Sequence, residues 1–193
     1  MQDLLLAVAA TLRARDLPAA RHAGDLLAAA AQRADACPEQ PGFTPPFLER
    51  ALAAPGADPL TRLLAPLAPA LRWSDTSANM TMPEGFRGRY SAAEITGPDG
   101  MIPAADFRFG TFLQYPDTWY PIHHHAAEEL YFILSGTAEW TRDGIDGQPE
   151  PPGTLFRHAP HERHATRTPG EPLLALWVWL GDIDSGSYRV EGG

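Results

Sequence analysis

From about Thr76 onward the sequence consists of short β-type runs separated by turn residues, and this pattern restricts the possible folds most strongly. The runs are FRFGTFLQY, ELYFILSGTAEWT, GTLFRHAP and LLALWVWLGD. Asp143-Gly144 and Pro169-Gly170 lie between them, and such dipeptides favour tight turns. Short strands at regular spacing predict an antiparallel β-sandwich or barrel. The last run is apolar on both faces, so we expect it to form an inner strand that is covered on each side.

The first 75 residues follow a helical spacing instead. Apolar residues recur at that spacing in LLLAVAATL, and Pro18 lies where a second helix can begin. PPFLERALAA and DPLTRLLAPLAPALRW indicate two further short helices. The predicted organisation is therefore an N-terminal helical segment, residues 1–75, packed on a β-domain formed by residues 76–193.

The charge balance restricts the partners of the chain. With 15 basic and 24 acidic residues the net charge is −9, whereas nucleic-acid binding calls for a basic face. The N-terminal apolar run is too short for a membrane span, and Asp3 stands where a signal peptide is positive. We expect a cytoplasmic protein with a small-molecule partner and no nucleic-acid or membrane partner. A homodimer is left open, because the helical layer could also pack on a second subunit.

The stretch WYPIHHHAAEELYFILSGTAEW concentrates histidines and glutamates at the start of a predicted strand. His123 and His125 are two residues apart and so share one face of a strand. Glu129 follows, and Tyr131 continues the alternation. A divalent cation accepts imidazole nitrogen and carboxylate oxygen, and three such ligands leave positions open for catalysis. The spacing favours a metal site over the other reading, a solvated polar loop.

A fourth ligand is expected from FRHAPHERHAT, which contains His158, His161 and His164. A turn is predicted at Pro160, and the chain re-enters the barrel after it. That spacing favours His164 as the ligand. We expect the other two histidines to cap or line the turn.

These residues resemble two sequence motifs of the cupin superfamily. The matching blocks, with their spacing kept, are His123-x-His125-x3-Glu129-x6-Gly136 and Pro151-x-Gly153 followed by Pro160-x3-His164. The resemblance implies a mainly β fold: a cupin-type antiparallel β-barrel, or jelly roll, preceded by the small helical layer. It also implies a metal ion bound inside the barrel by His123, His125, Glu129 and His164.

A narrower resemblance covers YPIHHHAAEELYFILSG, HAPHERHAT and the helical N-terminal third, which look like the bacterial dimethylsulfoniopropionate (DMSP) lyases of the DddQ group. It implies a carbon–sulfur lyase that cleaves DMSP, a small zwitterion, to dimethyl sulfide and acrylate. The implied cofactor is one divalent cation, Zn²⁺, Fe²⁺ or Mn²⁺. The cupin pattern makes His123 a ligand, whereas the lyase group also suggests that it lies beside the metal and contacts substrate.

The lyase resemblance assigns roles to three aromatic residues. Tyr131 shares a face with Glu129 and is the candidate base that removes the proton next to the substrate carboxylate; the alternative is a barrel tyrosine bonded to a neighbour. Tyr120 is a candidate substrate-binding residue or a rim aromatic. Trp177 and Trp179 share a face of the last strand, and π-faces attract a sulfonium; we assign Trp179 to the substrate, although core packing suits at least one of them.

Two other functions fit the same motifs. One is a cupin dioxygenase that uses iron and O₂ on another small substrate, which oxygen consumption would reveal. The other is a non-enzymatic, ligand-sensing cupin. Such sensors commonly carry a DNA-binding helical domain, and no helix-turn-helix is recognisable here.

Overall fold

A computed structural model describes residues 1–34, 42–79, 81–145, 147 and 149–191. It contains four α-helices and eleven β-strands within those ranges. The helices are α1 (Gln2–Arg13), α2 (Pro18–Ala31), α3 (Leu48–Leu52) and α4 (Thr61–Leu64), with short 3₁₀ turns η2 (Ala68–Ala70) and η3 (Ser185–Ser187). The strands are β1 (Tyr90–Gly97), β2 (Ile102–Pro103), β3 (Phe107–Gln114), β4 (Thr118–His124), β5 (Glu128–Ser135), β6 (Ala138–Arg142), β7 (Pro149–Glu150), β8 (Leu155–His158), β9 (His164–Thr168), β10 (Leu173–Leu180) and β11 (Arg189–Val190).

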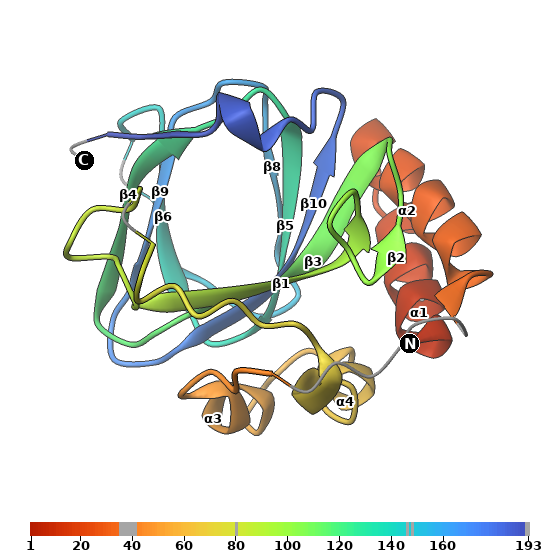
Figure 1. Cartoon of the computed structure of the whole chain (residues 1–193), viewed down its shortest axis with the longest axis horizontal. Coiled ribbons are helices and arrows are strands. Elements are labelled where there is room, and N and C mark those ends of the chain that lie inside the picture. The colour runs from red at the N-terminus through yellow and green to blue at the C-terminus, as the bar shows by residue number, and fades with distance from the viewer. Residues whose placement is uncertain (35–41, 80, 146, 148, 192–193) are drawn as a thin grey trace.

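The strands form two sheets that face each other. One sheet has the order β2-β1-β3-β10-β5-β8, and the other has the order β11-β4-β9-β6-β7. All pairings are antiparallel except that between β1 and β2. Figure 1 shows the two sheets as opposite walls around a common interior, with α1 and α2 outside one wall. The predicted fold class, a mainly β cupin-type architecture with N-terminal helices, is confirmed, although the two sheets do not join into one closed barrel.

Strand β10 is the inner strand that the sequence predicted. It pairs with β3 on one side and β5 on the other. Its side chains alternate between two hydrophobic cores. Leu174 and Leu176 pack with the helices, whereas Leu173 and Ala175 pack between the sheets. Strand β5 divides in the same way, so that Tyr131 faces the interior and Leu130 faces the helices. This two-residue period points the chemically active residues of both strands into the interior.

The helical segment packs on the outer face of the six-stranded sheet. Leu4, Leu5 and Leu27 belong to the same buried cluster as Phe109 and Leu113 of β3. Figure 1 places α1 and α2 beside β2 and β10, and α3 and α4 at one end of the barrel. Among the described residues, no helix combines the length and the apolar character needed to cross a membrane.

Candidate metal centre

The histidine-rich strand β4 reaches the interior through an irregularity in its pairing. The register between β4 and β9 shifts between Tyr120 and His123. These two residues are an odd number apart, so a regular strand would point them to opposite faces. The shift compensates for this parity, and both side chains are buried inside the barrel. The ring of His123 stacks on that of Tyr120, with centroids 3.9 Å apart.

Three buried side chains converge at one point of the interior. His125, Glu129 and His164 each offer a ligand atom, and these atoms lie within 4.8 Å of one another. The Nε2 atoms of both histidines lie 3.3 Å from the same carboxylate oxygen, Glu129 Oε2. His125 directly follows β4, Glu129 is the second residue of β5, and His164 is the first residue of β9. Such a group could hold a metal ion.

The hydrogen bonds of the rings fit a cation. The Nδ1 atom of His125 lies 3.0 Å from the carbonyl oxygen of Ala127, and that of His164 lies 2.9 Å from the carbonyl oxygen of Glu162. Because Nδ1 must carry the proton in these bonds, a neutral ring presents the lone pair of Nε2. Two lone pairs then face one carboxylate oxygen, and the buried Nε2 of His164 has no hydrogen-bond partner among the described residues. Three acceptors at one point call for a positive charge, and Nδ1 bonds of this kind accompany metal-binding histidines.

Glu129 is held in its charged form. Burial raises the pKa of Glu129, but the neighbouring rings of His125 and His164 lower it further, so it lies well below its usual value. Its second oxygen, Oε1, accepts a hydrogen bond of 2.7 Å from Nε1 of Trp179. This bond fixes the carboxylate so that Oε2 faces the histidines. Trp179, assigned from the sequence to the substrate, therefore also contacts the metal-binding group.

His123 lies next to this group without being part of it. Its Nδ1 bonds to the carbonyl oxygen of Pro121 at 2.8 Å, and its ring centroid is 4.0 Å from that of His164. Burial lowers the pKa of His123 well below its usual value, so the ring is neutral. It lines the cavity described below. The structure thus brings together three of the four predicted ligands and places the fourth beside them.

A cavity of about 280 Å³ opens onto the group. Its wall includes Tyr90, Tyr120, Tyr131 and Tyr188, which are four of the five tyrosines of the chain. The hydroxyl of Tyr131 has no hydrogen-bond partner among the residues that the structure describes, so the reading of Tyr131 as a barrel tyrosine bonded to a neighbour finds no support. Burial, together with the charge of Glu129, raises the pKa of Tyr131 well above its usual value.

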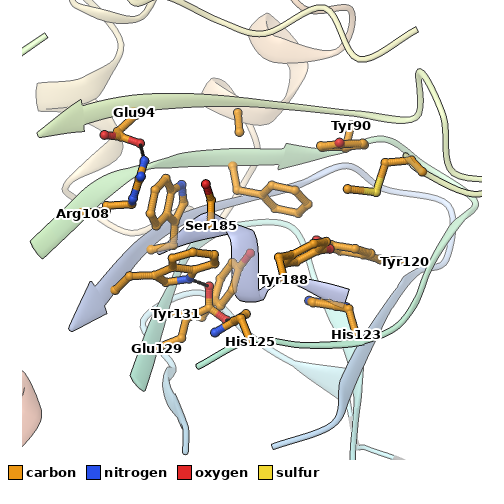
Figure 2. Close-up of a pocket in the computed structure, with 15 residues that line it drawn as sticks. Tyr90, Glu94, Arg108, Tyr120, His123, His125, Glu129, Tyr131, Ser185 and Tyr188 are labelled. Atoms are coloured by element: carbon orange, nitrogen blue, oxygen red, sulfur yellow. Dashed lines mark hydrogen bonds and ion pairs between the residues drawn. The ribbon is translucent and has the colours of Figure 1, made fainter. Parts of the chain in front are cut away.

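Tyr188 is a cavity residue that the sequence did not reveal. Its hydroxyl forms a hydrogen bond with that of Tyr120, and burial raises the pKa of both tyrosines well above the usual value. Tyr188 follows the short turn η3, beyond the last long strand. No periodic pattern extends to this position, so only the folded chain brings it to the cavity. Figure 2 shows Tyr188 between Tyr120 and the Tyr131 side of the cavity.

The remaining wall of the cavity consists of two tryptophan rings and an ion pair. The rings of Trp177 and Trp179 lie 6.0 Å apart in an edge-to-face arrangement, and both line the cavity. Arg108 bonds to Glu94 at 2.7 Å and to Asp99 at 3.1 Å. Figure 2 shows the Arg108–Glu94 pair on the opposite side of the view from His123. Because the carboxylates of Glu94 and Asp99 both engage Arg108, it is an ion-pair partner.

The other histidines lie outside the group of ligand atoms. His158 is the last residue of β8, is completely buried, and stacks on His164 with ring centroids 4.0 Å apart. Its Nδ1 lies 3.2 Å from the Glu162 carboxylate in the following turn. His161 occupies that turn with a φ of 63°, and its backbone N–H bonds to the carbonyl oxygen of His125. The turn before His164 is thereby bonded to His125, the residue that directly follows β4.

The fold and this centre together define a cupin-type β-protein with a buried His-Glu-His group that suits a metal ion. Residues 16–175 match the family model for dimethylsulfoniopropionate lyase. The chain therefore belongs to the DMSP lyase family.

Two curated relatives and two solved structures illustrate the likeness. The DMSP lyase DddQ of Ruegeria pomeroyi is 33% identical over 116 residues, which cover 59% of this chain and 57% of the relative. The putative DMSP lyase DddL of Cereibacter sphaeroides is 32% identical over 124 residues, or 63% of this chain and 51% of the relative. The chain thus aligns with little more than half the length of these relatives.

Among solved structures, the fold is similar to one described as that of the DMSP lyases RdDddP and RnDddQII, with a TM-score of 0.71, 24% identity, and coverage of 98% of this chain and 96% of that chain. The crystal structure of DddQ from Ruegeria pomeroyi gives a TM-score of 0.70 at 24% identity, with coverage of 98% and 95%. At this identity the likeness concerns the fold.

Proposed function

We propose that this protein is a metal-dependent carbon–sulfur lyase that cleaves DMSP to dimethyl sulfide and acrylate by β-elimination. Membership of the DMSP lyase family supports the substrate. The observation that carries the reaction type is the free hydroxyl of Tyr131, which faces the cavity beside the His125–Glu129–His164 group. A base next to a site for a carboxylate is what this elimination requires.

The proposed reaction needs one base and one leaving group. The Tyr131 oxygen takes the proton from the carbon beside the carboxylate. The electron pair of that C–H bond becomes the second bond of acrylate. The pair of the C–S bond leaves with sulfur as neutral dimethyl sulfide, so the sulfonium needs no acid. A general base of this kind typically contributes about 10²- to 10⁴-fold in rate.

His125, Glu129 and His164 would hold the cation, and we propose Zn²⁺, Fe²⁺ or Mn²⁺ from these ligand types. When bound, it supplies positive charge that draws electron density from the substrate carboxylate and favours the phenolate form of Tyr131. His123 would stand beside the substrate. The faces of Trp177 and Trp179 would receive the sulfonium by cation–π attraction, and Tyr120 would belong to the substrate-binding wall.

Headspace dimethyl sulfide is the direct test. Protein loaded anaerobically with each metal receives DMSP, and Tyr131→Phe and Tyr115→Phe are assayed beside the wild type. Tyr115 is a matched control, because its buried hydroxyl bonds to Ser91 and does not line the cavity. We expect release by the wild type and the control, and a loss of at least about 100-fold in Tyr131→Phe at unchanged metal content.

Two results would overturn parts of the proposal. Equal release by Tyr131→Phe would remove that tyrosine as the base while keeping the lyase. No release with any metal would reject the lyase, and oxygen uptake would then test the dioxygenase alternative.

A further inference from the structure

The residues that follow β10 form a strap over the cavity. We call residues 181–191 the C-terminal strap. Figure 1 shows it crossing from the six-stranded sheet to β4. On one side Arg108 Nε donates to the carbonyl oxygen of Ile183 at 3.1 Å. On the other side Ser187 Oγ accepts from the N–H of Ala126 at 3.0 Å, and β11 pairs with β4. The strap is therefore fixed to both sheets.

This anchoring places Tyr188 within the site. Its ring centroid lies 5.6 Å from that of His123 and 6.3 Å from that of His125. Tyr120 lies deeper, stacked between Phe86 and His123 with ring centroids 4.1 and 3.9 Å away. Tyr188 thus lies on the metal-binding side of the two tyrosines, as Figure 2 shows.

The hydrogen-bonded pair of Tyr120 and Tyr188 has one O–H group that is not used within the pair. Two hydroxyls carry two protons, and the bond between Tyr120 and Tyr188 uses one of them. Neither hydroxyl has a further hydrogen-bond partner in the described part of the chain, and both residues line the cavity. The second O–H is therefore available to a molecule in the cavity. A hydroxyl that accepts one hydrogen bond becomes a stronger donor for the next.

The substrate offers one kind of acceptor. In a zwitterion of a carboxylate and a sulfonium, only the carboxylate oxygens accept hydrogen bonds, because the sulfonium is positively charged. Negative charge on these oxygens grows as the neighbouring carbon loses its proton. A fixed O–H donor that points at them therefore stabilises the transition state more than the bound substrate.

We propose that Tyr188 is a substrate-binding residue whose hydroxyl donates a hydrogen bond to the substrate carboxylate. Tyr120 acts through it, by donating to the Tyr188 oxygen. This inference rests on the proposed function for the identity of the substrate. The feature it uses, a donor aimed at a carboxylate beside His125, holds for any small carboxylate in the cavity.

The test combines kinetics with binding of propionate, a carboxylate without a leaving group. The variants are Tyr188→Phe, Tyr120→Phe, the double variant, and Tyr115→Phe as the matched control. All are loaded with metal, and metal content is measured. A hydrogen bond to a charged group is worth about 1.5–3 kcal/mol, so we expect Tyr188→Phe to lower kcat/KM about 10- to 100-fold and to weaken propionate binding. Because the charge grows in the transition state, kcat should fall more than KM rises.

Tyr120→Phe should have the smaller effect, about 3- to 10-fold, because it removes only the donor to Tyr188. The double variant should be no worse than Tyr188→Phe alone. Tyr115→Phe should leave both readouts unchanged.

Wild-type kcat/KM and propionate affinity in Tyr188→Phe would overturn the inference. So would fully additive losses in the double variant, since residues that act in series are not additive. If the wild type released no dimethyl sulfide but bound propionate in a Tyr188-dependent way, the proposed function would fail while the carboxylate-binding role would stand.

Discussion

Replacing Trp179 with phenylalanine separates two roles that the same ring could have. The substitution removes the Nε1–H that donates to Glu129 Oε1 at 2.7 Å but keeps an aromatic face in the cavity. A hydrogen bond to a carboxylate contributes about 1.5–3 kcal/mol. If the bond holds Glu129 in position, its loss should weaken metal binding by about 10- to 100-fold, the range found for partners of metal ligands.

The assay is metal affinity, measured by competition with a chelator on wild type and variant. Trp177→Phe is the matched control, because it changes the neighbouring cavity indole, whose Nε1 bonds to no described residue. We expect the control to bind metal as the wild type does. The rate of DMSP cleavage at saturating metal is then compared, since saturation offsets a loss of affinity but not a loss of substrate contact.

The two measurements distinguish a role of Trp179 in positioning Glu129 from a role in binding the sulfonium. Weaker metal binding with near-normal cleavage at saturating metal supports the positioning of Glu129. Metal affinity within about 2-fold of the wild type, far below the 10-fold minimum expected for a lost ligand partner, refutes this reasoning. If cleavage also fell in that case, Trp179 would act on the sulfonium alone.

Three further predictions concern the ligands, the sheet and the pH dependence. His164→Ala should abolish tight metal binding, whereas His123→Ala should retain it, which a metal titration of both proteins checks; equal losses would make His123 a ligand. Gly110→Ala should lower the free energy of unfolding by about 1–3 kcal/mol in urea, because a Cβ there would press on a backbone oxygen of β1 and lie 2.8 Å from the Trp177 ring; unchanged stability would contradict this. The hydrogen bond from the buried His158 lowers the pKa of Glu162 from 4.5 to about 2. Its stabilising effect is therefore complete above pH 4.5 and is lost as the pH falls towards 2. The difference in unfolding free energy between wild type and Glu162→Gln should shrink over that window, and a constant difference would argue against the lowered pKa.

Much of the fold can be predicted from local sequence, because the alternation of apolar and polar side chains determines which face of a strand is buried. LLALWVWL has apolar residues at every position, and β10 is covered on both sides. Tyr131 follows Glu129 by two residues, and both face the interior. Local sequence says nothing about which distant strand becomes a neighbour. The pairing of β4 with β9, which places His123 opposite His164, follows from the closure of the whole fold.

The site shows the same division. The spacing of His125 and Glu129 predicted their shared direction, and His164 was placed by the turn before it. Tyr120 and His123 face the same side because of a strand irregularity, which the sequence spacing does not show. Tyr188 belongs to no periodic run, and the Trp179–Glu129 bond joins residues 50 positions apart. These features depend on tertiary contacts, which determine what a correctly oriented side chain meets.

The orientation of the three histidine rings has a local origin. His123, His125 and His164 each bond through Nδ1 to a backbone carbonyl only two residues away. The backbone of the same segment therefore selects the ring tautomer, and no side chain has to be conserved for this purpose. The bonds should survive any substitution that keeps the local conformation. Glu129 differs, because its second oxygen depends on the side chain of Trp179. Of the contacts that orient the ligand group, this one can be changed by a single side-chain substitution, and it is therefore the place where metal affinity can be adjusted without rebuilding the turn.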